Sequence, residues 1–455
     1  MDKQQRVRDP LHNIIEFGAS EFELAMWRVV QTGTFQRLRR VKQLGLSDFV
    51  YPGATHSRFA HSLGVFHTAR QLMKIVQRFE IFEETKAHQA MAAALLHDVG
   101  HGPFSHAFEE VGKQLDLKLV NHESISEQLI RESEIADVLN SFDSGFADSV
   151  ADLIRIDTGS IYSAVVSSQF DADRIDYMQR DRLMTGAQHG AIDFEWLMAN
   201  LEVANVPYGP SCEESKIQTF VLGPKAICAA ETYVLGLFHL YRTVYLHKTT
   251  RGAEKLLVEL LVRIISLGRD NTWKYTGLPY QHPLLVFARN QSSLRYLMEL
   301  DDFVLWGALS FLTAASDEVV RDLALRLQKR RLYKCIDVRE LLQTQFGFNN
   351  NSVVDKACEI ISNKISDWLD HKVCKTPHII TDRAERKPYH RYYETTGPVN
   401  QIQIRTSKDE LVDLIKLSKV VSEIDPFELF RVYVSNEEAR IFVNQTIDSV
   451  IIKMC

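Results

Sequence analysis

A histidine and an aspartate stand side by side at the end of an apolar segment of this 455-residue chain. His97 and Asp98 close an alanine-rich run that predicts a buried helix over residues 87–99, and Gly100 marks its end. Burying an imidazole and a carboxylate is unfavourable unless both find partners. A divalent metal satisfies them together, because histidine supplies a nitrogen ligand and aspartate a hard oxygen ligand. The pair therefore predicts a metal centre.

A closed metal site needs further ligands, and other predicted helices provide them. His61 lies in the helix predicted over residues 59–79, and the motif DADRID supplies one more acid from Asp171, Asp173 and Asp176. A single histidine is more often a hydrogen-bonded core or surface residue, and Asp98 alone has the alternative of being a salt-bridge partner. A carboxylate at the C-terminal end of a helix opposes the helix dipole, however, which favours the functional interpretation.

Helical periodicity dominates the first 345 residues and must position these side chains. The predicted helices lie within residues 21–44, 59–79, 87–99 and 226–267. Prolines and glycines over residues 205–225 enclose a short β-like run, which predicts a hairpin or loop insertion.

The character of the chain changes after a linker predicted at residues 346–352, where three asparagines follow one another. Residues 399–405 and 429–434 alternate as strands do, and residues 409–416 resemble a helix. The sequence therefore predicts a mainly α fold, with a helical domain over residues 1–345 and a small α+β domain over residues 350–455.

Composition narrows the class of protein. The formal net charge is −6, which disfavours a nucleic-acid coat or a membrane-surface binder, because both need an excess of basic residues. The six cysteines form no C-x-x-C pair, a pattern typical of the reducing cytoplasm. No apolar run approaches the roughly 20 residues that span a bilayer. We therefore expect a cytoplasmic protein with no membrane partner.

Several motifs together resemble a known family. They are DPLHNII from Asp9, FQRLRRVKQLG from Phe35, YPGATHSRFAHSLGV from Tyr51, HDVGHGPFSH from His97, NHE from Asn121 and DADRIDYMQRD from Asp171. The H…HD…D pattern resembles the HD-domain metal phosphohydrolases. The flanking residues are more similar to one branch, the deoxynucleoside triphosphate (dNTP) triphosphohydrolases. The resemblance implies an HD-domain helical core for the mainly α fold.

The resemblance also implies a ligand set and a reaction. The ligands of a divalent transition metal (iron, manganese or zinc, with a possible second magnesium or manganese) would be His61, His97, Asp98 and Asp173. Water would attack the α-phosphorus of a dNTP and release deoxynucleoside and inorganic triphosphate. Such chemistry needs an activated water, neutralised phosphate oxygens and a proton for the leaving oxygen.

The family's other site residues carry over position by position. His101 would act on the leaving oxygen, His122 and Glu123 would support it, and His106 would lie on the phosphate side. The implied contacts to phosphate and deoxyribose are Arg58, Arg174, Gln43, Leu44, Tyr177, Asp181 and Tyr245.

Two departures from the family pattern bear on substrate and regulation. Gln31 stands where allosterically activated relatives read a guanine with aspartate, and Leu237 stands where an arginine would bind triphosphate. An activator nucleotide therefore remains only an expectation, as does a homodimer or homotetramer. Two basic groups could bind phosphate or be solvated surface: Arg37, Arg39 and Arg40, and Arg383, Arg386, Lys387, His390 and Arg391.

Other functions stay open at this point. One is an HD phosphohydrolase for a mononucleotide, cyclic nucleotide or modified nucleotide. Another is a defence-associated nuclease or a nucleotide-binding regulator. The ligand set with His101 and His122 favours an enzyme over a pure binder, and the net negative charge gives a nuclease little support.

Overall fold

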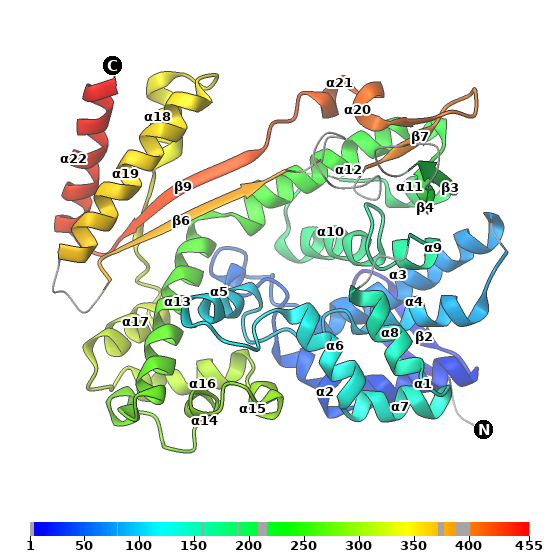
Figure 1. The fold of residues 1–455 in the computed structure, drawn as a ribbon, viewed down its shortest axis with the longest axis horizontal. Coiled ribbons are helices and arrows are strands. Elements are labelled where there is room, and N and C mark those ends of the chain that lie inside the picture. The colour runs from blue at the N-terminus through cyan, green and yellow to red at the C-terminus, as the bar shows by residue number, and fades with distance from the viewer. Residues whose placement is uncertain are drawn as a thin grey trace.

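The computed structural model describes residues 4–79, 81–155, 159–188, 191–207, 216–371, 377–387, 389 and 401–454. Its fold is mainly α, as the sequence predicted (Figure 1). Within the described residues, no helix combines the length and the apolar character that crossing a membrane requires.

Four helices build the part of the fold that carries the predicted metal ligands. They are α1 (Glu21–Gln31), α3 (Arg58–Phe79), α4 (Glu84–Leu96) and α10 (Ala172–Thr185). α4 packs against α3 and α8 (Phe146–Arg155) through a run of buried alanines, whose small side chains let helices approach closely. α3 and α4 confirm the predicted helices. The helix predicted over residues 21–44 instead ends at Gln31, where Thr32 caps both α1 and the next turn.

The remaining elements of the helical body surround these four. In chain order they are α2 (Gly33–Gln36), η1 (Arg37–Arg40), η2 (Ser47–Phe49), α5 (His106–Leu115), α6 (His122–Glu132), α7 (Glu134–Phe142), α9 (Ile161–Ala164), α11 (Phe194–Ala199), η3 (Pro224–Ala226), α12 (Ile227–Leu240), η4 (Tyr241–Tyr245), α13 (Lys248–Arg269), η5 (Trp273–Thr276), α14 (Pro283–Arg289), α15 (Leu294–Met298), α16 (Asp302–Leu312) and α17 (Glu318–Gln328). The helix predicted over residues 226–267 is thus two helices joined at η4, a π-helical turn.

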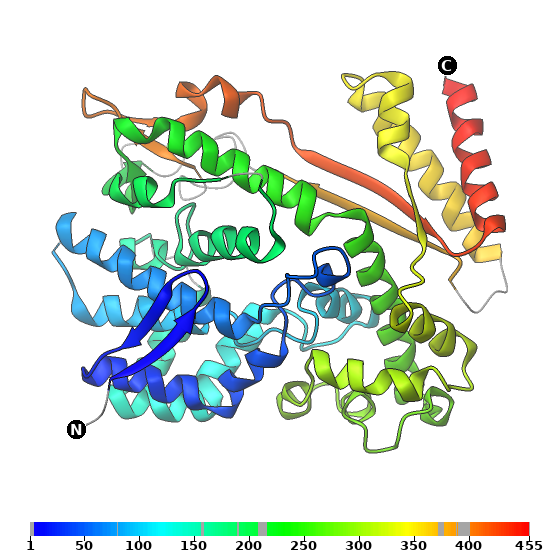
Figure 2. The same cartoon turned by 180° about the vertical axis from the view of Figure 1, so that it is seen from behind.

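An N-terminal hairpin lies against the outer side of α3 (Figure 2). Strands β1 (Gln5–Asp9) and β2 (Asn13–Phe17) pair antiparallel, with Val7 opposite Ile15. The Asp9 carboxylate accepts hydrogen bonds from the backbone N–H groups of Leu11 and His12, which shapes the turn. Buried Phe17 stacks on Phe66 of α3 and anchors the hairpin.

The predicted hairpin is confirmed by β3 (Leu201–Pro207) and β4 (Lys216–Leu222), which pair antiparallel. β7 (Gln403–Arg405) and β8 (Leu411–Asp413) extend this sheet in the order β3-β4-β7-β8. The helix predicted over residues 409–416 is therefore wrong in its first half. Pairing with β7 holds Leu411–Asp413 extended, and only α20 (Leu414–Leu417) is helical, followed by α21 (Lys419–Ser422).

A second sheet has the order β5-β9-β6 and consists of β5 (Lys334–Asp337), β9 (Phe427–Val434) and β6 (Ile379–Arg386). Figure 1 shows β6 and β9 as a long ribbon beside α18 (Val338–Phe346), α19 (Asn351–His371) and α22 (Glu437–Met454). These helices and β9 share a smaller core of their own. The predicted linker matches the loop between α18 and α19. The domain division near residues 345–350 stays a prediction; β5 before it pairs with β9 after it.

The contact between α3 and α10 requires a glycine. A Cβ atom at Gly64 would lie 2.0 Å from Oδ1 of Asp176 and 2.3 Å from Nη2 of Arg180. Both of those side chains are fully buried and tied to each other. The two helices can therefore approach only because residue 64 has no side chain.

We predict that Gly64→Ala lowers the free energy of unfolding by about 1–3 kcal/mol, because the added methyl group overpacks this contact. Chemical denaturation of the purified variant measures the change. Gly307→Ala is the matched control: it also lies within a helix but meets nothing within 4 Å. The control should gain up to about 1 kcal/mol from helix propensity. Equal stability of the two variants would contradict the prediction.

Candidate metal and catalytic site

The four predicted metal ligands converge from α3, the end of α4 and α10. Nε2 of His61 lies 2.9 Å from Oδ1 of Asp173 and 3.7 Å from Oδ2 of Asp98. Nε2 of His97 lies 3.4 Å from Oδ1 of Asp98 and 3.6 Å from Oδ1 of Asp173. His61, His97 and Asp173 place one ligand atom each within a single metal-sized group. Asp98 lies beside them, so one point of the structure brings all four together.

The nitrogen atoms at this point fit a metal. Nε2 of His61 and Nε2 of His97 are buried and have no hydrogen-bond partner among the described residues. The opposite nitrogens are satisfied: Nδ1 of His97 lies 2.8 Å from the carbonyl oxygen of Ala94, and Nδ1 of His61 lies 2.9 Å from Oδ2 of Asp176. A carbonyl oxygen accepts only, so Nδ1 of His97 carries the proton and Nε2 presents a lone pair. Buried polar atoms without partners are rare, and such second contacts are usual for metal-ligating histidines.

The charges of the side chains at the site also favour a bound metal. Burial alone lowers the pKa of His61, but the neighbouring carboxylates of Asp173 and Asp176 outweigh burial and raise it to about 10. Burial raises the pKa of Asp98, but Arg58 and His97 outweigh it and hold that pKa well below its usual range. The acids are therefore ionised at neutral pH. Their negative charges lie close together and are stabilised by positive charge between them, which a divalent cation supplies.

Arg58 lies beside this group and touches Asp98 directly. Its Nη1 donates to Oδ2 of Asp98 and its Nε donates to Oγ of Ser105, at 2.8 Å. Ser105 and the preceding Phe104 both have positive φ, a strained backbone for residues with side chains. The N–H of Phe104 is held by the buried carboxylate of Asp302, at 2.7 Å. This strained loop therefore places the Arg58 guanidinium at the metal group.

The basic segment that follows α2 supports the same loop. Arg37 is buried, and its guanidinium donates to the carbonyl oxygens of His101 and Leu300, at 2.8 and 2.9 Å. Arg40 pairs with Asp301. Arg37 is therefore not part of a solvated face, and its guanidinium braces the backbone of His101, whereas Arg39 and Arg40 are exposed.

A cluster of histidines adjoins Asp98 on the side of α5 and α6. Nε2 of His101 lies 3.2 Å from Oδ1 of Asp98, and its ring stacks on His122 with centroids 3.9 Å apart. His106 meets both rings edge-on, at 5.5 and 5.9 Å. Burial and the charge of Arg58 lower the pKa of His101 well below its usual value. The predicted His101, His106 and His122 thus share one cluster beside the metal group.

The acid in this cluster is Glu109 and not the predicted Glu123. Oε1 of Glu109 bonds Nδ1 of His122, and its Oε2 lies 3.3 Å from Nδ1 of His106. Glu123 is exposed and pairs with none of these histidines among the described residues. Sequence reasoning missed Glu109, although its spacing of three from His106 on one helix gave the signal.

The predicted deoxyribose residues form a polar group around Asp181. One carboxylate oxygen of Asp181 lies 2.7 Å from Nε2 of His56, and the other accepts from the Tyr245 hydroxyl at 2.8 Å. Tyr245 lies in the π-helical turn, and Tyr177 meets its ring edge-on at 6.2 Å. Gln43 is half-buried, and its side-chain carbonyl oxygen is buried without a hydrogen-bond partner among the described residues; Leu44 beside it is buried. His56 is the member of this group that the sequence did not reveal.

The Arg174 guanidinium already has partners within the protein. Its Nη1 lies 3.3 Å from Oε1 of Gln169 and its Nε lies 3.4 Å from Oδ2 of Asp171. Asp171 in turn caps α10, as its Oδ1 accepts from the N–H of Arg174 at 2.7 Å. A phosphate contact by Arg174 would require it to exchange these partners.

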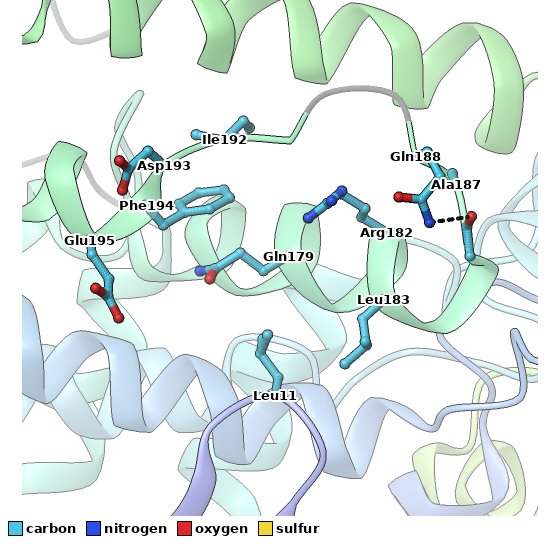
Figure 3. A pocket seen from close by; sticks show the side chains of 11 residues that line it. Leu11, Gln179, Arg182, Leu183, Ala187, Gln188, Ile192, Asp193, Phe194 and Glu195 are labelled. Atoms are coloured by element: carbon cyan, nitrogen blue, oxygen red, sulfur yellow. Dashed lines mark hydrogen bonds between the residues drawn. The ribbon is translucent and has the colours of Figure 1, made fainter.

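A separate pocket of about 380 Å³ lies along the C-terminal half of α10 (Figure 3). Gln179 and Arg182 on α10 face the segment that carries Ile192 and Phe194 across it. None of the predicted site residues lines this pocket, so it is distinct from the metal group.

Comparison with known proteins agrees with this geometry. Residues 58–181 match the HD domain family. YwfO of Bacillus subtilis is 28% identical over 430 residues, which are 93% of this chain and 90% of that protein. A deoxynucleoside triphosphate triphosphohydrolase SAMHD1 homolog of Dictyostelium discoideum is 32% identical over 274 residues, which are 57% of this chain and 50% of that protein. This chain thus spans about half the length of that relative.

A solved structure resembles the whole fold. The crystal structure of a phosphohydrolase from Bacteroides thetaiotaomicron superposes with a TM-score of 0.73 at 25% identity, covering 95% of this chain and 100% of that one. The chain therefore contains an HD domain over residues 58–181 and resembles deoxynucleoside triphosphate triphosphohydrolases in sequence, as its motifs predicted.

The three acids of DADRID allow a sharp test of the ligand set. Asp173→Asn should lose bound metal after incubation with Mn²⁺ and desalting, because it removes a charged ligand atom from the group. Asp171→Asn is the matched control. Burial raises the pKa of Asp171 to about 7, so a neutral amide resembles its protonated form and still caps α10. Elemental analysis measures metal per chain, and equal metal content in both variants would contradict the assignment.

Proposed function

From the HD domain over residues 58–181, we propose that this chain is a metal-dependent hydrolase of dNTPs that releases deoxynucleoside and inorganic triphosphate. One observation carries the proposal: α10 bears both Asp173, the proposed metal ligand, and Asp181, which accepts a hydrogen bond from the Tyr245 hydroxyl. They are eight residues apart, about two helical turns and roughly 12 Å along the axis. A substrate with phosphate at one end and sugar at the other would span them.

The proposed ligands His61, His97, Asp98 and Asp173 would hold iron, manganese or zinc, with a second magnesium or manganese in reach of the phosphates. When bound, the metal lowers the pKa of a water molecule and polarises a phosphoryl oxygen. Asp98 and Asp173 set the charge of the site, and Arg58 adds a guanidinium that can turn toward phosphate oxygens.

The histidine cluster is suited to the leaving oxygen. Glu109 fixes the ring of His122, and the stacked ring of His122 fixes His101 beside Asp98. The phosphate's negative charge would favour a protonated His101, which would then donate to the leaving 5′-oxygen. His106 is exposed and meets the same cluster, so it would contact the phosphate chain.

The polar group at Asp181 would recognise deoxyribose. Asp181 and the unpartnered carbonyl oxygen of Gln43 would accept from the 3′-hydroxyl. Tyr245 is held against Asp181, and with Leu44 and Tyr177 it would leave no room for a 2′-hydroxyl. Arg174 would add a phosphate contact after leaving Asp171.

One observation favours a second substrate class. Leu237, which stands where the relatives bind triphosphate with arginine, is buried in the core. A mononucleotide, cyclic nucleotide or modified nucleotide would not need that contact. A nuclease or nucleotide-binding regulator of a defence system remains a further alternative.

An activator nucleotide and a homodimer or homotetramer belong to the same proposal. The basic cluster near residue 383 gives them limited support. Arg383 lies over the Phe430 ring at 4.3 Å and donates to the carbonyl oxygen of Cys358, so it faces the protein. His390 and Arg391 lie outside the described residues.

Product analysis tests the proposed reaction. The chain should convert dNTPs, but not NTPs, to deoxynucleoside and inorganic triphosphate in the presence of Mn²⁺, as resolved by ion-exchange chromatography. Cyclic nucleotides, mononucleotides and single-stranded DNA form the comparison panel. Nucleoside monophosphates from dNTPs, or cleavage of DNA alone, would contradict the proposal.

Variants of Glu109 and Glu123 test which of these two glutamates supports His122. Glu109→Gln should lower kcat about 10–100-fold, because losing the carboxylate loosens the His122–His101 stack. Glu123→Gln is the matched control and should leave kcat unchanged, since that side chain is exposed. Both variants should keep their metal. A larger loss of kcat in Glu123→Gln would refute the role given to Glu109.

A further inference from the structure

The ring nitrogen of His61 that faces away from the proposed metal position, Nδ1, contacts a buried carboxylate. Nδ1 of His61 lies 2.9 Å from Oδ2 of Asp176, which is fully buried. Nδ1 donates to this carboxylate, so Nε2 of His61 faces Asp98 and Asp173, where a metal ion would take the place of its proton. The orientation of Asp176 therefore decides where the lone pair of His61 points.

Asp176 is itself held by the N-terminal hairpin. Nε2 of His12, in the β1–β2 turn, lies 2.6 Å from Oδ1 of Asp176. Arg180 donates to both oxygens of Asp176, at 2.7 and 2.9 Å. The same guanidinium donates to Asp9 of the hairpin at 2.8 and 3.3 Å. Asp9 and His12 thus reach the metal ligand through one carboxylate.

The network has little freedom to adjust. Arg180 and Asp176 are fully buried, and Gly64 of α3 lies against both of them. Asp9 cannot turn away without releasing the backbone N–H groups of Leu11 and His12 that it holds. If the turn moved, Asp176 would therefore have to move with it, because no surface side chain could rotate to compensate.

We propose that the β1–β2 turn is a positioning element of the metal centre, in which Asp9 and His12 fix the orientation of His61 through Arg180 and Asp176. The inference rests on the proposed role of His61 as a metal ligand. None of the three residues Asp9, His12 and Arg180 touches the metal group. Metal affinity therefore depends on a hairpin that lies outside the HD domain matched at residues 58–181.

Titration of the metal-free full-length protein with Co²⁺, followed by its visible d–d absorption, tests this directly. His12→Leu removes the donor to Asp176 and should weaken Co²⁺ binding about 10–100-fold. His12→Gln, whose amide can still donate, should bind within a few-fold of the unaltered chain. His67→Gln is the matched control. Its ring lies 4.8 Å from that of His12, yet it has no bond to Asp176, so Co²⁺ binding should not change.

Asp9→Asn separates positioning from general stability, because Asp9 lies three hydrogen bonds away from His61, through Arg180 and Asp176. Positioning predicts weaker Co²⁺ binding and an altered d–d spectrum, beyond any fall in the Tm of the metal-free protein. Unchanged Co²⁺ affinity in both Asp9→Asn and His12→Leu would overturn the inference. His97→Gln, measured in parallel, should also lose Co²⁺. If it alone keeps the metal, the ligand assignment behind the proposed function fails instead.

Discussion

Two histidine Nε2 atoms and two carboxylates converge where α3, α4 and α10 meet, and the rest of the structure is arranged around that constraint. Such a group is unfavourable without positive charge, because Asp98 and the two Nε2 atoms are buried and Asp173 lies against them. The small alanines of α4 and the missing side chain at Gly64 let the helices come close enough to form it. A metal ion would convert the least favourable point of the fold into its most strongly held one.

Several residues around this point each hold one side chain or backbone group of the site in place. Arg58 and the strained backbone at Ser105 hold Asp98, while Arg37 holds the carbonyl oxygen of His101 from the far side. Glu109 holds His122. Asp98, His101 and His122 thus each have a partner in another element, which would keep these groups in place before a substrate binds.

The sequence predicted what repeats locally and missed what forms across space. The spacing of histidines and acids within apolar helices grouped His61 with His97 and Asp98 and left three acids of DADRID as candidates, among which the family resemblance selected Asp173. Helical periodicity placed α3 within one residue of its observed ends and α4 within three. Glu123 follows His122 in the chain but is exposed, and the acid that bonds His122 is Glu109 from α5, which adjacency in the chain could not reveal. The strand at Leu411–Asp413 was missed for a similar reason: it is extended only because β7 pairs with it.

Anomalous diffraction from crystals grown with Mn²⁺ tests the central claim most directly, because it locates the metal without assuming any reaction. The account predicts an anomalous peak bonded to Nε2 of His61 and Nε2 of His97, with Asp98 and Asp173 completing the ligand set. His106, Glu109 and His122 form another group that could hold an ion. A peak in that group with none at His61, or no bound manganese at either position, would contradict the account.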